Sequence, residues 1–150
     1  MTTSANTAER EITVSRLLNA PIALVWEVWT NPDHIKNWWR PNGFTNTITK
    51  MEVIPNGLWN LVMHGPDGTD YDNESIFTEV EWQKKIVYHH ISGHEFIATI
   101  LFEERGNQTY LHWQMLFESK EELIRIMNLY NISEGLQQNI EKMEAYLKNL

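Results

Sequence analysis

The chain has 150 residues, a length that suits a single domain with a hydrophobic core of its own. Hydrophobic residues make up 42% of it and charged residues 21%, as is usual for globular proteins. The formal net charge is −8, and the longest basic run is the pair Lys84-Lys85. Because a basic surface is missing, nucleic acid is excluded as an expected partner, and contact with an anionic membrane is disfavoured.

The sequence also lacks the marks of disulfide-linked, membrane-spanning and secreted proteins. It has no cysteine, which excludes disulfides, thiolate nucleophiles and zinc knuckles. It has no apolar run of about eighteen residues, so we expect no membrane insertion. Residues 1–10 are polar and lack the apolar segment of a secretory signal. We therefore expect a disordered tail at residues 1–10, one domain at residues 11–150 and a cytoplasmic location.

Local patterns predict a strand and two short helices at the start of the domain. Residues 11–18 contain several β-branched side chains and end at a turn sequence, which is typical of a strand. Pro21 suits the first turn of a helix, and the apolar residues of 22–29 recur at helical spacing. Asn31-Pro32-Asp33 repeats the signal of a cap followed by proline, so a second helix should run to about Trp38.

Four of the seven tryptophans lie within the fourteen residues from Trp26 to Trp39. So much rigid apolar area must be covered by a sheet, a long helix or a ligand. Trp38 and Trp39 are adjacent, and at a helix end both can pack. One would lie under the edge of the sheet and the other at the mouth of a cavity. The alternative is a hydrophobic staple between the two short helices.

From Phe44 onward the pattern changes to strands. Alternating side chains and turn residues predict six of them, at residues 45–54, 58–64, 71–82, 86–90, 96–103 and 109–117. Turns are expected at Pro55-Asn56-Gly57 and at Gly65-Pro66-Asp67-Gly68, since proline presets φ and glycine accepts positive φ. The last strand alternates most clearly, with apolar residues on one face at Leu111, Trp113, Met115 and Phe117. The short connections imply an antiparallel meander.

Two helices are predicted after the last strand. Ser119 and Glu122 form a capping box, and the helix that it begins should continue through Met127. After Asn131 a long helix carries apolar residues on one face, at Leu136, Ile140, Met143 and Leu147. Only this helix is long enough to cover the apolar face of the sheet. We therefore predict an α+β fold in which a curved antiparallel β-sheet of about six to seven strands grips the long C-terminal helix, with two short helices after the first strand.

Several short motifs occur in a fixed order along the chain. They are Ala20-Pro21 before Val25-Trp26, Thr30-Asn31-Pro32-Asp33, residues 38–44, residues 55–59, residues 63–68, residues 77–80 and Gly135-Leu136. With these motifs the chain resembles the START-like superfamily, also called helix-grip or SRPBCC, over about residues 11–148. Within it, the chain is similar to bacterial homologues of the activator of the ninety-kilodalton heat-shock protein's ATPase. It departs from that family at Asn56, where the first glycine of a Gly-Gly pair is usual.

The resemblance implies a cavity between the sheet and the long helix. Family members with known roles bind lipids, sterols or other hydrophobic molecules, or act as cyclases or co-chaperones. We therefore expect the chain to bind a small hydrophobic molecule, as a monomer or homodimer. The alternatives are a co-chaperone-like module that docks on a protein partner and a cyclase or hydrolase that uses polar groups of the cavity. The resemblance also places a small residue at Gly135, so crowding should make Gly135→Val destabilising.

The inward-facing side chains of the predicted sheet and helices are the candidate cavity residues. They are Trp39, Trp59, Leu61, Met63, Tyr88, His90, Ile100, Trp113, Met115, Met127, Tyr130, Leu136, Ile140 and Met143. Methionine adapts to apolar ligands of different shapes, and Tyr88, His90 and Tyr130 would supply the few polar groups that a ligand pocket holds. From the residues alone, a filled core explains the same set.

We expect no metal site and no cofactor. Histidines and one acidic residue gather at His89, His90, His94, Glu95 and His112. Neighbours on a strand point to opposite faces, however, and no His-Glu-x-x-His spacing occurs. The acidic hairpin at residues 67–74 does not have the residue order of a calcium loop, because its glycine precedes most of the acids.

A catalytic alternative depends on Glu79. This residue would act as a general base with His90, whereas the competing interpretation is an exposed strand glutamate beside Glu81. No nucleophile elbow, phosphate-binding loop or dinucleotide fingerprint occurs in the sequence. We therefore assign no catalytic residue from the sequence.

Overall fold

The computed structural model describes residues 8–150. Residues 1–7 of the expected tail lie outside the described residues. Ala8–Arg10 form a short 3-10 helix in place of a disordered tail. The Arg10 guanidinium donates a hydrogen bond to the carbonyl oxygen of Phe117 at 2.8 Å, which ties this helix to the end of the sheet's last strand. Ordered structure therefore begins before residue 11.

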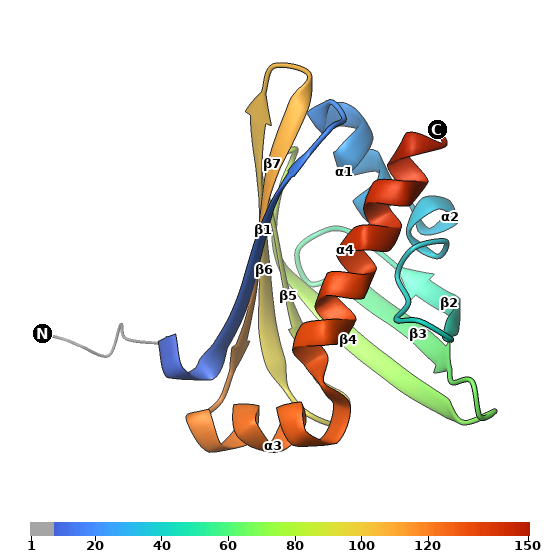
Figure 1. Ribbon diagram of the computed structural model, residues 1–150, viewed down its shortest axis with the longest axis vertical. Helices are drawn as coiled ribbons and strands as arrows, with labels where there is room; N and C mark the ends of the chain where they lie inside the picture. The colour runs from blue at the N-terminus through green and yellow to red at the C-terminus, as the bar shows by residue number, and fades with distance from the viewer. Residues whose placement is uncertain (1–7) are drawn as a thin grey trace, which may run out of the picture.

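Seven strands form one curved sheet (Figure 1). The strands are β1 (Glu11–Leu18), β2 (Thr45–Met51), β3 (Leu58–His64), β4 (Asp70–Glu81), β5 (Lys85–His90), β6 (Phe96–Arg105) and β7 (Gln108–Phe117). Their order in the sheet is β1-β7-β6-β5-β4-β3-β2, and each neighbouring pair is antiparallel. Consecutive strands from β2 to β7 are therefore neighbours, and β1 pairs with β7. The predicted antiparallel meander is confirmed.

Two short helices follow β1 and two helices follow β7. They are α1 (Ile22–Thr30), α2 (Pro32–Ile35), α3 (Lys120–Tyr130) and α4 (Ile132–Lys148). Figure 1 shows α4 lying across one face of the sheet, so the predicted α+β helix-grip arrangement is confirmed. Asn131 has φ 46° and separates α3 from α4, and its side chain caps α4 by accepting from the Glu134 N–H at 3.4 Å. Among the described residues, no helix has the length and apolar character needed to cross a membrane.

Several element boundaries differ from the sequence prediction, and two elements end three residues earlier than it expects. α2 ends at Ile35 rather than near Trp38. The Trp38 side chain turns inward instead, and its indole N–H donates to the carbonyl oxygen of Val28 at 3.0 Å. β2 ends at Met51 rather than at residue 54, because a hydrogen-bonded turn follows it. In both places backbone hydrogen bonds close a turn where the residue pattern predicts that the helix or strand continues.

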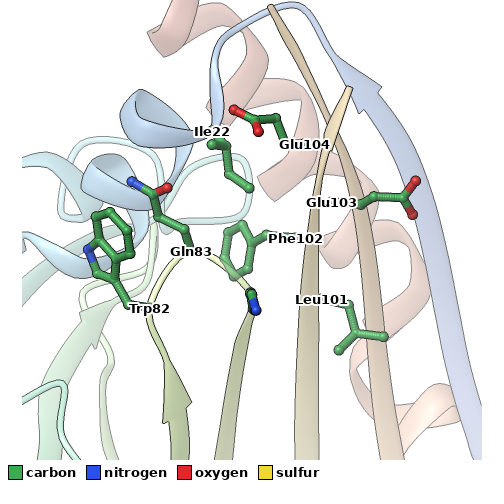
Figure 2. Close-up of a pocket in the computed structure, with 8 residues that line it drawn as sticks. Ile22, Trp82, Gln83, Leu101, Phe102, Glu103 and Glu104 are labelled. Atoms are coloured by element: carbon green, nitrogen blue, oxygen red, sulfur yellow. The ribbon is translucent and has the colours of Figure 1, made fainter. Parts of the chain in front are cut away.

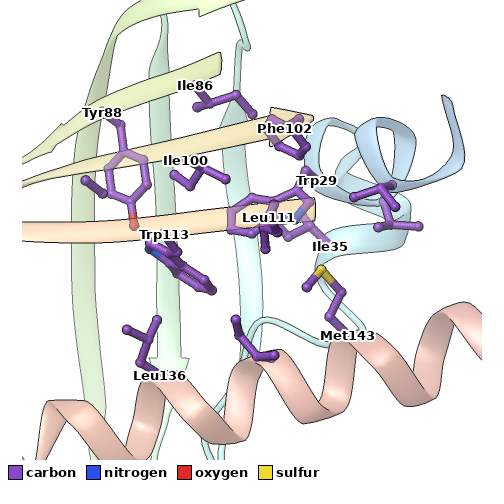
Figure 3. Close-up of a cluster of buried hydrophobic side chains, with 14 of the residues drawn as sticks. Trp29, Ile35, Ile86, Tyr88, Ile100, Phe102, Leu111, Trp113, Leu136 and Met143 are labelled. Carbon is purple, nitrogen blue, oxygen red and sulfur yellow. The ribbon is translucent and has the colours of Figure 1, made fainter. Parts of the chain in front are cut away.

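The core lies between the inner face of the sheet, α1 and α4 (Figure 3). In β7 every second residue from Leu111 to Phe117 is buried, as the alternation predicts. Trp29 of α1 packs edge-on against Trp113 of β7, with ring centroids 4.9 Å apart. Trp29 also packs edge-on against Trp38 at 4.9 Å. Contacts between aromatic rings therefore join α1 to the sheet. They also bury much of the apolar area of the tryptophan-rich segment.

Candidate functional site

A cavity of about 570 Å³ lies between the inner face of the sheet and the first turns of α4. Side chains of β3 to β7 form its sheet wall. α4 forms the facing wall, with Ile132, Gly135, Leu136 and Asn139. The loops after α2 and after β5 form the rim. The cavity is therefore formed by segments that lie far apart in the sequence.

Aromatic side chains form much of the sheet wall. Trp113 stacks on Trp39 of the rim, with ring centroids 5.3 Å apart and planes at 22°. Tyr88 is only 3% exposed, and burial raises the pKa of its hydroxyl, so this group stays neutral near pH 7. Figure 3 shows Tyr88 and Trp113 directed towards α4, with Leu136 facing them. Contact between rings makes this wall rigid.

The loop between α2 and β2 closes one side of the cavity. The backbone N–H of Asn42 donates to Gln138 Oε1 at 2.9 Å, and Lys142 Nζ donates to Asn42 Oδ1 at 2.7 Å. At the start of β2, Asn46 Nδ2 donates to the carbonyl oxygen of Trp39 in the loop at 2.8 Å. These hydrogen bonds hold the loop against α4 and keep the Trp39 ring in the rim.

His90 lies at a polar end of the cavity, where it is 7% exposed. Its ring stacks on Phe96, with centroids 4.7 Å apart and planes at 10°. Its Nδ1 lies 2.9 Å from the carbonyl oxygen of His94, and its Nε2 lies 3.0 Å from Asn73 Oδ1. Burial lowers the pKa of His90 because the imidazolium loses its water, although the contact with the His94 carbonyl opposes this shift. Burial also lowers the pKa of His94.

We expect the free energy of unfolding to fall as the pH drops below about 6.5, with His90 contributing to the fall. The unfolded chain protonates this histidine near its ordinary pKa, whereas the lowered pKa in the folded chain resists protonation. Acid therefore favours the unfolded state, so stability is retained above the unfolded pKa and lost as the pH falls towards the folded one. Urea unfolding at pH 7.5 and at pH 5.5 should show a larger loss for the parent than for His90→Gln.

His112→Gln is the matched control for this measurement. His112 lies on the other face of the sheet, where its Nδ1 is 2.6 Å from Ser15 Oγ. This variant controls for the loss of a histidine ring that lies outside the cavity. Equal losses for the parent and for His90→Gln would show that His90 protonates as readily in the folded chain as in the unfolded one, contrary to the expectation.

Asn139 contributes a buried amide to the helix wall. It is 9% exposed and lies on α4 beside Leu136 and Ile140. Its Oδ1 has no hydrogen-bond partner among the described residues, and the same holds for the indole N–H of Trp113. Each such unpaired buried group costs about 1–3 kcal/mol. The helical spacing of apolar residues does not identify Asn139, because Asn139 is polar. The signal that could have identified it is a polar residue within the apolar face of the helix.

The residues predicted for the cavity fall into two main groups. Those that line it are Trp39, Met63, Tyr88, His90, Trp113, Met115 and Leu136. Those that pack in the core are Trp59, Leu61, Ile100, Ile140 and Met143. Met127 is half-buried on α3, outside the lining, and the side chain of Tyr130 lies outside the described part of the structure.

Side-chain depth explains this division. Alternation and helical spacing identify the inward face, but not how far below that face a side chain lies. Tyr88 and Trp59 pack edge-on with ring centroids 5.2 Å apart. Of these two neighbouring rings, Tyr88 lines the cavity and Trp59 lies in the core. Rim residues such as Phe44, Tyr71 and Ser92 were missed because they lie in loops or near strand ends, which the apolar patterns do not cover.

The surroundings of Gly135 correct the expectation of crowding. A Cβ at this position would meet only Pro41 Cγ, at 3.9 Å, which is an ordinary van der Waals contact. The expected close approach of this backbone to the sheet is therefore wrong. The reason is that Gly135 lines the cavity, which separates this turn of α4 from the sheet.

Gly135→Ala should raise the free energy of unfolding by about 0.5–1 kcal/mol, because alanine loses less conformational entropy in a helix than glycine does. The new methyl group has room, since its nearest neighbour is the Pro41 ring. Urea denaturation followed by circular dichroism measures the change. A lower stability than that of the parent would show that the added methyl group is strained.

The catalytic alternative required the Glu79 carboxylate beside His90, and the structure places it elsewhere. A β-bulge interrupts β4 between Phe77 and Glu79. Phe77 is consequently buried, whereas Glu79 is exposed and accepts a hydrogen bond from Lys85 Nζ at 3.0 Å. Within residues 8–150, no three His, Cys, Asp or Glu side chains are grouped as a metal site would need.

A second hollow, of about 550 Å³, lies at the opposite end of β5 (Figure 2). Trp82 and Gln83 of the β4–β5 turn lie on one side of it, and Leu101 and Phe102 of β6 lie on the other. Trp82 is 71% exposed, so one of the two aromatic side chains of this hollow faces water. The cavity beside α4 is the better candidate site, because buried aromatic and polar side chains, among them Tyr88, His90 and Asn139, share its wall.

Residues 19–148 match the family described as Activator of Hsp90 ATPase homolog 1-like protein. No curated protein matches the sequence. The fold is similar to that of a protein from Nitrosomonas europaea, with a TM-score of 0.84 and 22% identity, covering 95% of this chain and 96% of that one. A protein from Arthrobacter aurescens has a TM-score of 0.87 and 24% identity, covering 97% of this chain and 90% of that one. An AHSA1-like protein from Aeromonas hydrophila has a TM-score of 0.73 and 19% identity, covering 93% of this chain and 92% of that one.

At these identities the solved structures establish a shared fold alone. The family match extends from the end of β1 to the end of α4, and it agrees with the order of the short sequence motifs. The chain therefore belongs to the family of Activator of Hsp90 ATPase homolog 1-like proteins, within the START-like superfamily.

Proposed function

We propose that the chain binds a small hydrophobic molecule in the cavity between the sheet and α4. The observation that carries this proposal is the cavity itself, whose volume of about 570 Å³ falls in the range of about 300–1,000 Å³ that is typical of ligand pockets. Its aromatic residues offer rigid apolar contact area. Met63 and Met115 add flexible side chains that adapt to the shape of a ligand.

Polar side chains among the apolar ones also support the proposal. A cavity that is only a packing defect is lined by apolar groups and stays dry. In this cavity Asn73, His90 and Asn139 share the lining with tryptophan, tyrosine and phenylalanine side chains. A few polar groups in an apolar wall are the arrangement that orients a bound small molecule.

N-phenyl-1-naphthylamine, a neutral fluorescent probe, should bind the purified chain in a saturable way at about one site. Its emission should rise on binding, because the probe leaves water for an apolar environment. Tryptophan emission should fall, since Trp39 and Trp113 lie in the cavity wall. A flat titration on folded protein would refute the proposal.

Gly135 provides a way to block the cavity without altering the core. Gly135→Phe would place a ring against the cavity from α4, whereas Gly135→Ala adds one methyl group where there is room for it. Gly135→Phe should lose at least about tenfold in affinity for the probe, and Gly135→Ala should bind like the parent. Thermal unfolding checks that both variants are folded. Unchanged binding by Gly135→Phe would mean that the probe binds elsewhere.

A further inference from the structure

We propose that the ligand is a lipophilic cation, whose apolar body lies in the cavity and whose ammonium group lies at the rim against Phe44 and Tyr71. This inference rests on the proposed function, because it names the class of molecule that the same cavity takes. It depends on three observations: accessible aromatic rings at the rim, an acidic side chain on the same rim, and the absence of basic side chains from the described lining.

Phe44 and Tyr71 present aromatic rings at the rim of the cavity. Tyr71 is 43% exposed and Phe44 is half-buried, so the protein leaves part of each side chain accessible. The two ring centroids lie 6.2 Å apart, with the planes at 43°. A cation binds over an aromatic face within about 6 Å of the ring centroid. One ammonium group can therefore lie within reach of both rings.

The carboxylate of Glu134 places a negative charge on the same rim. Its Oε1 accepts from Gln138 Nε2 at 3.3 Å, and Gln138 Oε1 accepts from the Asn42 N–H at 2.9 Å. These hydrogen bonds join Glu134 to the loop that carries Phe44. Its Oε2 accepts from Asn131 Nδ2 at 2.8 Å. Both hydrogen bonds to the carboxylate come from neutral amides, so they leave its charge uncompensated.

The described lining of the cavity supplies no positive charge. It contains no lysine or arginine. Arg40 and Lys142 lie near the rim but outside the lining, and Lys142 Nζ is bound to Asn42 Oδ1 at 2.7 Å. Burial lowers the pKa of both His90 and His94, so these rings are neutral near pH 7. An anionic group here would lose water without a cationic partner in the lining, which is unfavourable.

The N-terminus of α4 also lies at the cavity, and a helix N-terminus attracts anions. Groups of the chain already occupy this end. Asn131 Oδ1 accepts from the Glu134 N–H at 3.4 Å, and the Asn131 carbonyl oxygen accepts from the Gly135 N–H at 3.2 Å. Glu134 itself is the acidic residue of the first turn. An anionic ligand would therefore meet a carboxylate at this helix end.

The test compares three biphenyls of similar size for their ability to displace N-phenyl-1-naphthylamine at pH 7. They are 4-(aminomethyl)biphenyl, a cation, 4-biphenylmethanol, which is neutral, and biphenyl-4-carboxylate, an anion. Salt at about 150 mM screens the attraction between the cation and distant charges of the chain. The cation should bind at least about tenfold more tightly than the carboxylate and about threefold more tightly than the alcohol. Equal or tighter binding of either competitor would overturn the inference.

Phe44→Leu tests the role of the aromatic rim, because leucine keeps an apolar side chain and removes the ring. The ratio of the affinities for the cation and the alcohol should fall by about twofold or more, while the affinity for the alcohol stays within about twofold. Tyr110→Leu is the control. The Tyr110 ring lies outside the cavity lining, with Arg105 Cζ 4.5 Å from its centroid, so this variant should keep the ratio. An unchanged ratio in Phe44→Leu would overturn the role of the ring.

Glu134→Gln tests the acidic side chain of the rim. The ratio of the affinities for the cation and the carboxylate should fall by about threefold or more. Glu141→Gln changes the net charge equally, at an exposed position of α4 outside the lining, and should keep the ratio. Equal falls in the two variants would assign the preference to the net charge of the chain and overturn the role of the rim.

The outcomes separate this inference from the proposed function. If the probe binds but the parent does not prefer the cation, the inference fails and the proposed function stands. If the probe does not bind the folded parent, both fail. Thermal unfolding of each variant shows that a lost preference does not come from a lost fold.

Discussion

Trp38→Ala is expected to lower the free energy of unfolding by about 3–5 kcal/mol. Trp38 is fully buried, with 0% of its surface exposed, so its removal leaves a large cavity. Its ring packs edge-on against Trp29 at 4.9 Å, and its indole N–H pairs with the Val28 carbonyl oxygen. The substitution therefore removes aromatic packing and a buried hydrogen bond together.

The position of Trp38 also connects the core to the candidate site. Trp29 contacts both Trp38 and Trp113, and Trp113 forms part of the cavity wall. Loss of the Trp38 ring should consequently weaken binding of N-phenyl-1-naphthylamine as well as stability. Urea denaturation followed by far-ultraviolet circular dichroism measures the stability change.

Trp82→Ala is the control for this substitution. Trp82 is 71% exposed, so its replacement should change the free energy of unfolding by no more than about 0.5 kcal/mol. A similar loss for Trp38→Ala and Trp82→Ala would show that burial does not decide the effect of these tryptophans.

Gly57→Ala is expected to destabilise the fold by about 3 kcal/mol, through a steric clash that no side-chain rotation relieves. A Cβ at Gly57 would lie 2.0 Å from the carbonyl oxygen of Glu52. That oxygen belongs to the backbone, so the turn between β2 and β3 would have to move.

Movement of this turn would disturb β4. The Gly57 carbonyl oxygen accepts from the Phe77 N–H at 2.9 Å, and the Asn56 N–H donates to the Phe77 carbonyl oxygen at 2.7 Å. Phe77 is 2% exposed and stacks on Trp59, so the disturbance would reach the core. Gly135→Ala, whose methyl group has room, should instead raise stability. If both alanine variants were as stable as the parent, the clash at Gly57 would be disproved.

The same turn shows how the chain departs from its family without changing the fold. Asn56 has φ 69°, a left-handed conformation that glycine adopts freely and asparagine tolerates better than most other residues. The residue that replaces the usual glycine is thus one that accepts the required backbone. The departure stays local because only this turn depends on it.

The order of the elements could be predicted from the sequence because its signals are local. Alternation in residues 111–117 names the buried face of β7, and the Ser119 cap places the start of α3, where its side chain accepts from the Glu122 N–H at 3.0 Å. The spacing of Leu136, Ile140 and Met143 names the inward face of α4. These patterns depend on residues within a few positions of each other, so they can be recognised without knowledge of the tertiary contacts.

Which side chains line the cavity depends on the tertiary structure. The same apolar pattern places Trp59 in the core and Tyr88 at the cavity wall, since only the packing of separate strands sets how deep each ring lies. The adjacent Trp38 and Trp39 are likewise separated, the first into the core and the second into the rim.

The sequence by itself thus determined which elements form, in which order, and which face of each is apolar, because caps, turns and periodicity act over a few residues. Only the tertiary structure decided that Gly135 has open space beside it, that Asn139 lacks a hydrogen-bond partner, and that a bulge turns Glu79 away from His90. Each of these depends on distances between segments that are far apart along the chain, which no local pattern encodes.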